Sequence, residues 1–124
     1  MSTGAVGTIV IGRYGFRGAK KELPASVEIK VVNCKKIGDD RKVPNLRQLK
    51  LAEIVVGMRK LYAKKFDAAV KEVVAEVREG RTVCCACMMG KNRSQAVALV
   101  AQLELAAEGK SVEVVYLGDL RATP

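Results

Sequence analysis

Apolar residues in four short segments follow the patterns of β-strands. Residues 8–11 form a β-branched run that ends before Gly12, and residues 83–87 form an uninterrupted apolar run, as in a strand buried on both faces. Residues 27–31 alternate valine and isoleucine with charged residues, which is the two-residue period of a half-buried strand. Residues 112–117 predict a last strand, so a four-stranded sheet is expected.

Three further segments have the spacing of amphipathic helices. From residue 46 onward apolar residues recur at helical intervals, and a clearer single face follows between residues 66 and 77. Gly80 stands where the residue after a helix end is expected. A third helix is predicted over 95–108, with Gly109 as its stop. The side chains expected to face the core are Leu46, Leu49, Ile54, Met58 and Leu61 in the first helix, Phe66, Ala69, Val70, Val73, Val74 and Val77 in the second, and Leu99, Val100, Leu103 and Ala107 in the third.

The order of these elements predicts the class of fold. Strand, strand, helix, helix, strand, helix, strand is the order of a layered α/β domain with a partly parallel sheet. The last strand–helix–strand unit is expected to cross over right-handed. Residues 35–44 are polar and predict a loop. With 124 residues and no repeat or linker, the chain is expected to form a single domain over 1–124.

Positive charge is concentrated in the first half of the chain. Residues 1–65 hold 15 Lys and Arg against 5 Asp and Glu, a net of +10, whereas residues 66–124 hold 7 against 8, a net of −1. Such a field attracts polyanions such as RNA, although ordinary solvated helix and loop faces can give the same count. The residues expected to contact nucleic-acid phosphates are Arg13, Arg17, Lys20, Lys21, Lys35 and Lys36.

Composition limits the catalytic mechanisms and metal sites that the chain can have, and it indicates a cellular location. No apolar run approaches the roughly 18–20 residues that span a bilayer, and the N-terminus lacks the features of a secretory signal, so a cytoplasmic protein without membrane contact is expected. The absence of histidine rules out Ser-His-Asp and Cys-His catalysis within the chain. The four cysteines are expected to be free thiols. No metal site or cofactor is expected, because neither a second cysteine pair nor a histidine completes a zinc site.

The segment with the clearest chemistry runs from Cys87 to Ser94, between the third strand and the following helix, and has the form Cys-x5-Arg-Ser. Backbone N–H groups in such a turn, together with a helix N-terminus, form a concave site for an oxyanion. Gly90 permits a backbone conformation that other residues resist, and Arg93 can grip two phosphate oxygens at once. The residues expected to form this phosphate site are Cys87, Met88, Met89, Gly90, Lys91, Asn92, Arg93 and Ser94.

Within this loop, Cys87 lies where the positive groups converge, which favours its thiolate form. Ser94 can cap the helix or donate a hydrogen bond to Cys87. The pattern is not a Walker A loop, because the upstream glycine is missing and Asn92 stands where Ser or Thr is required. A basic turn without a ligand is the plainer alternative, but the strand before the loop and the helix after it favour an anion site.

Much of the chain resembles the C-terminal domain of RapZ, the bacterial RNase adapter protein. Residues 87–94 are similar to that family's Cys-Thr-Gly-Gly-Lys-His-Arg-Ser loop, with Asn92 in place of the family histidine. Residues 14–18 are similar to its Phe-Gly-Phe-Lys-x-Gly turn, and residues 23–32 to the segment that follows. Residues 112–120, which end in Gly-Asp-Leu, are similar to the family's final strand and its Arg-Asp-Leu ending.

The resemblance implies a phosphosugar or another phosphorylated metabolite in the loop, RNA binding through basic residues, and self-association. It does not imply catalysis. Arg17 matches a family lysine in the first turn and is therefore added to the phosphate site. The loop residues that carry over are Cys87, Gly90, Lys91, Arg93 and Ser94.

The same loop also resembles that of the dual-specificity phosphatases, in which Gly-Lys-x-Arg-Ser is common. In that interpretation Cys87 is the nucleophile and Arg93 the phosphate clamp, and Asp39 or Asp40 could act as the general acid. Against it, Ala86 stands where those enzymes place a histidine, and a solvated turn is the commoner role for two such aspartates. Whether the chain is an enzyme is therefore left open by the sequence.

Overall fold

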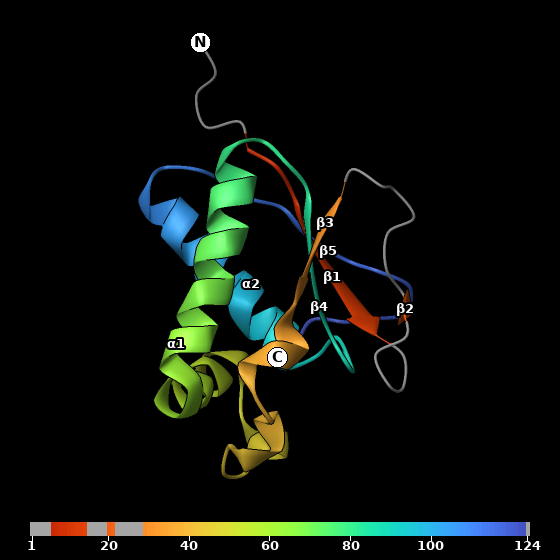
Figure 1. The fold of residues 1–124 in the computed structure, drawn as a ribbon, viewed down its shortest axis with the longest axis vertical. Helices are drawn as coiled ribbons and strands as arrows, with labels where there is room; N and C mark the ends of the chain where they lie inside the picture. The colour runs from red at the N-terminus through yellow and green to blue at the C-terminus, as the bar shows by residue number, and fades with distance from the viewer. Residues whose placement is uncertain (1–5, 15–19, 22–28, 124) are drawn as a thin grey trace.

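The structure is a computed structural model in which residues 6–14, 20–21 and 29–123 are described. Two long helices pack against each other and lie on one side of a five-stranded sheet (Figure 1). The strands are β1 (Ile9–Tyr14), β2 (Lys20–Lys21), β3 (Lys30–Asn33), β4 (Val83–Cys87) and β5 (Val114–Tyr116), and the helices are α1 (Leu51–Arg78) and α2 (Arg93–Ala107).

The sheet is largely parallel. Strands β3, β4, β1 and β5 lie in that order and run parallel, and β2 pairs antiparallel with the end of β1. The predicted α/β class and the partly parallel sheet are therefore confirmed, while the two-residue strand β2 was not predicted. Arg13 of β1 lies opposite Cys87 of β4, so the carboxyl ends of the two central strands meet at one edge.

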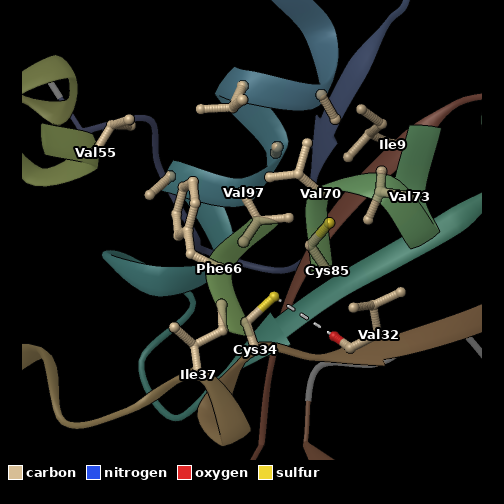
Figure 2. Packing of buried hydrophobic residues seen from close by; sticks show 14 of the residues in the cluster. Ile9, Val32, Cys34, Ile37, Val55, Phe66, Val70, Val73, Cys85 and Val97 are labelled. Carbon is tan, nitrogen blue, oxygen red and sulfur yellow. Dashed lines mark hydrogen bonds between the residues drawn. The ribbon is translucent and has the colours of Figure 1, made fainter. Parts of the chain in front are cut away.

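The main core lies between the sheet and the two helices. The face of α1 predicted from its helical period is buried, with Phe66, Val73 and Val77 fully inaccessible. Figure 2 shows Phe66 and Val73 in the same cluster as Val97 of α2 and Cys85 of β4. Burying each such side chain stabilises the fold by about 1.5–3 kcal/mol. A smaller cluster on the opposite face of the sheet contains Val10, Cys84 and Ala86.

The two helices predicted before β4 form one element. Helix α1 runs from Leu51 to Arg78 and departs from helical backbone angles at Tyr62 (φ −138°, ψ 44°). Its start is five residues later than predicted, because residues 46–48 form a separate 3-10 turn. Glu53 accepts the backbone N–H of Lys50 at 2.9 Å and thereby caps the helix start. The kink at Tyr62 explains why the sequence shows two apolar stretches rather than one.

Three side chains predicted to face the core are exposed: Leu61, Leu103 and Ala107. Leu61 immediately precedes the kink in α1. In α2 the buried face instead contains Ala98, Ala101 and Leu105. Leu103 lies on the part of α2 that the neighbouring elements leave uncovered, and it is 59% exposed.

Several element boundaries also differ from the predictions. Strand β1 continues through Arg13 and Tyr14, which were predicted to be in a loop, because both residues pair with β2. The second predicted strand is observed over Lys30–Asn33, and its first two predicted residues lie outside the described part of the chain. The predicted loop 35–44 contains 3-10 turns, whereas Gly80 (φ +87°) and Gly109 (φ +79°) follow the helix ends as predicted. Among the described residues, no helix combines the length and apolarity that a membrane span needs.

Candidate functional site

The loop between β4 and α2 lies at the carboxyl edge of the sheet, where α/β folds commonly hold ligands. Cys87 is the last residue of β4 and Arg93 the first residue of α2. Met88 and Met89 are exposed, at 38% and 63%, and Lys91 is exposed as well. The predicted order of buried strand, loop and helix is therefore present.

Gly90 has the unusual backbone conformation that the sequence predicted, with φ +63°. The carbonyl oxygen of Gly12 would lie 2.9 Å from a Cβ at this position, and a methyl carbon of Leu120 would lie 3.0 Å away. Both the backbone angle and the available space therefore require glycine here. The consequence is a tight turn held against the end of β1.

Unpaired backbone N–H groups gather in this loop. The N–H groups of residues 91–94 donate to no acceptor within the described residues, and the first helical bond runs from Ala96 N to Asn92 O at 2.9 Å. The side chain of Asn92, at the N-cap position, makes no capping hydrogen bond. A helix start with uncapped N–H groups carries partial positive charge and suits an oxyanion.

Below the loop, the Cys87 Sγ donates to the Ser94 Oγ at 3.2 Å. Cys87 is 2% exposed and Ser94 is fully buried. Asn92, rather than Ser94, occupies the N-cap position, so Ser94 contacts the thiol instead of capping the helix. The thiol therefore lies at the inner end of the loop, next to a hydroxyl group.

The other three cysteines are core residues. All four cysteines are buried and free. A hydrogen bond with Cys85, followed by burial, raises the pKa of Cys34 well above its ordinary value. Burial, with a smaller contribution from Cys85, raises the pKa of Cys84 to about 12. Cys34 and Cys84 are therefore neutral packing groups at physiological pH.

The Arg93 guanidinium connects the start of α2 to the turn after β3. Its Nη1 donates to the carbonyl oxygens of Lys35 and Gly38 at 3.3 and 3.0 Å. Its Nε is buried without a hydrogen-bond partner among the described residues, and the nearest carboxylate oxygen, of Asp40, is 3.7 Å away. Arg93 thus uses Nη1 to hold the turn after β3, and its Nε forms an ion pair with Asp40.

The two neighbouring aspartates have different environments. Asp40 accepts a hydrogen bond from the Asn92 side chain at 3.1 Å, and its own side chain is 15% exposed. Asp39 binds Arg41, whose hydrogen bonds lower the pKa of Asp39. The expectation that both are solvated turn residues is therefore wrong for Asp40, which lies against the loop. No local pattern indicates this contact, because it joins residues 52 positions apart.

The sequence did not predict that Gln95 supports the loop through hydrogen bonds. Gln95 is 1% exposed, and its Nε2 donates to the carbonyl oxygens of Gly90 and Arg121 at 3.0 and 2.9 Å. Its Oε1 accepts the backbone N–H of Thr123 at 2.8 Å. The Thr123 hydroxyl donates to the Lys91 carbonyl at 3.2 Å. The only sequence signal was a lone amide in an otherwise apolar stretch of the helix.

The basic residues proposed for RNA are partly placed at the same edge. Arg13 pairs with Asp119 at 3.1 Å, and the Lys35 ammonium lies 5.3 Å from the centre of the Tyr14 ring. Lys36 is exposed. Lys20 and Lys21 form β2, while Arg17 lies outside the described residues. Arg13 and Lys35 are therefore near the end of β1, beside the loop.

Two open surface hollows lie elsewhere. One of about 670 Å³ runs between β3 and α1, and one of about 390 Å³ is lined by residues between 41 and 48; neither includes residues 87–94. In the described part of the chain, no three acidic, cysteine or histidine side chains are grouped to hold a metal ion.

Comparison of the chain with protein-family models, curated proteins and solved structures finds no match. Functional interpretation therefore depends on the geometry of the loop.

Proposed function

We propose that the chain is a phosphate-ligand-binding module, and that the loop 87–94 holds the phosphate group of a phosphorylated metabolite. The observation that carries this proposal is the set of N–H groups of residues 91–94, at the start of α2, which have no acceptor within the described part of the chain. Arg93 is the first residue of the same helix, and its guanidinium lies against Asp40. The resemblance to the RapZ C-terminal domain implies the same class of ligand.

Electrostatics favour this ligand over a neutral one. Each hydrogen bond from the loop to a phosphate oxygen is charge-assisted and contributes roughly 1.5–3 kcal/mol. The positive end of the α2 dipole adds to this attraction. Asp40 opposes it, because its carboxylate already contacts Asn92 and lies near Arg93. A phosphate dianion is therefore expected to compete with Asp40 for these groups.

The test is a titration of the protein with inorganic phosphate, followed by calorimetry and by amide resonances. Phosphate should shift the resonances of residues 90–94 first, and Arg93→Ala should weaken binding about tenfold or more, equivalent to at least ~1.4 kcal/mol. Arg78→Ala removes a surface arginine on α1 and should leave the affinity unchanged. Circular dichroism checks that both variants fold. An unchanged affinity in folded Arg93→Ala would contradict the proposed site.

A cysteine phosphatase is the second candidate, favoured by the Cys87–Ser94 hydrogen bond and by Asp40 beside the loop. The Cys87 sulfur would bond to phosphorus as the bond to the leaving oxygen breaks, and Asp40 would protonate that oxygen before water releases phosphate. Two observations favour binding instead: Cys87 is 2% exposed, and Asp40 is already held by Asn92. We therefore expect negligible turnover of aryl phosphates, which need little protonation. Robust turnover that disappears in Cys87→Ser would establish the enzyme.

RNA is proposed as an additional ligand, because Arg13 and Lys35 lie beside the loop and the next residue, Lys36, is exposed. If about five phosphates are neutralised, the affinity for single strands should fall as the salt concentration rises. A plot of the logarithm of the affinity against the logarithm of the salt concentration should have a slope of roughly −3 to −4. Replacing Lys35 and Lys36 with alanine should make that slope shallower. A slope near zero in the unmodified protein would exclude this ligand.

A further inference from the structure

Strand β3 forms one edge of the described sheet. Its neighbour there is β4, and no strand among the described residues pairs with its other side. An edge strand directs about half of its backbone N–H and C=O groups away from the sheet. Those groups can bind an added strand, and the shape and charge beside them decide which strand fits.

An open groove of about 670 Å³ runs along this edge, between β3 and helix α1. Its floor is apolar and includes Val32 and Ile37. Figure 2 shows Val32 and Ile37 on either side of Cys34, so the floor is backed by the core. Ala68 and Ala69 line the α1 wall and leave space there because neither has a side chain beyond Cβ.

The charges around the groove are unbalanced. Glu72 is neutralised by Lys30, whose Nζ lies 3.0 Å from its carboxylate. Lys36 and Lys65 also line the groove and are exposed, and neither forms an ion pair with any described residue. The groove therefore presents two positive charges beside an apolar floor and a strand edge with which no described strand pairs.

We propose that this groove binds an extended acidic peptide segment of a partner protein, which adds to β3 as a further strand. Alternate side chains of such a strand point to the same face. On the α1 side, an apolar residue would lie over the two alanines, and acidic residues would lie beside Lys36 and Lys65. A second copy of this chain fits poorly, because each copy has a net charge of +9. RNA matches the lysines but not the apolar floor or the strand edge.

The experiment uses a fluorescently labelled twelve-residue peptide that repeats Glu-Thr-Val-Thr, which places Glu and Val on one face of a strand. Anisotropy measures its binding to the full chain, and the same peptide with Lys in place of Glu is the charge control. The acidic peptide should bind, shift the amide resonances of residues 30–33 and lose affinity as salt rises. The Lys peptide should bind at least tenfold more weakly.

Two matched pairs of exposed helix variants locate the site. Lys65→Glu should weaken peptide binding tenfold or more, whereas Lys64→Glu makes the same charge change outside the groove and should weaken it less than threefold. Ala68→Trp should block the groove, and Ala63→Trp is its control. Equal losses in both charge variants, or unshifted resonances at 30–33, would overturn the proposal. Displacement of the peptide by oligouridine with equal dependence on Lys65 would also overturn it, by assigning the groove to RNA.

Discussion

The two ends of helix α2 are built in opposite ways. At its C-terminal end, the N–H groups of Glu108, Gly109 and Lys110 all donate to carbonyl oxygens of the last turn, and Arg78 pairs with Glu108. At its N-terminal end, the N–H groups of residues 91–94 have no acceptor within the described residues. The comparison separates a structural end, in which backbone groups are satisfied internally, from an end that retains donors for a ligand.

A glycine with a left-handed backbone angle lies near each end of α2. Substitutions at these two glycines should give the largest difference in stability between the two ends. Gly90→Ala combines backbone strain with a close contact to Gly12 O, and should cost roughly 2–4 kcal/mol of unfolding free energy. Gly109→Ala has open space around its Cβ and should cost about 1–2 kcal/mol. Urea denaturation measures both, and equal losses would show that the Gly90 turn can relax.

The second test concerns the hydrogen bonds by which Gln95 supports the loop. Gln95→Ala removes one buried and two partly buried hydrogen bonds and should destabilise the fold by roughly 2–3 kcal/mol, because several backbone groups lose a partner. Gln102→Ala, farther along the same helix, removes one bond to Val112 O and should cost about 1 kcal/mol. Gln95→Ala should also weaken phosphate binding, whereas Gln102→Ala should not. Thermal denaturation and phosphate titration of both variants measure the difference.

The smallest expected effect is at the C-terminal end of α2, where hydrogen bonds from Arg78 lower the pKa of Glu108 below its ordinary value of 4.5. Because the folded state favours the ionised carboxylate, this stabilisation is complete above pH 4.5 and decreases as the pH falls through the lowered pKa. The effect is small because the pair is exposed to solvent. The melting temperature of Glu108→Gln should therefore depend slightly less on pH in this range. An identical pH dependence in both proteins would show that the pair contributes nothing.

Within the loop, the sequence predicted the elements but not their partners. The strand before the loop, the helix after it and the left-handed glycine at position 90 all follow from local patterns, and the structure contains them. The contact of Asp40 with Asn92 and that of Gln95 with Arg121 join residues 52 and 26 positions apart. Local periodicity contains no information about such distant pairs. The ligand, the RapZ resemblance and the role of Cys87 stay predictions.

The sequence by itself determined those helices and strands in which the apolar residues follow one clear pattern. The apolar run of β4 and the valine face of α1 have one arrangement that hides their apolar atoms, so pattern and structure agree. Helix α2 is apolar on more than one side, so its helical period did not show whether the side chain of Leu103 or that of Leu105 would be buried. Only the tertiary structure decided this, because the neighbouring elements cover Ala98, Ala101 and Leu105 and leave Leu103 59% exposed. The long-range contacts of Arg93 and Gln95 were decided in the same way, by which strands became neighbours.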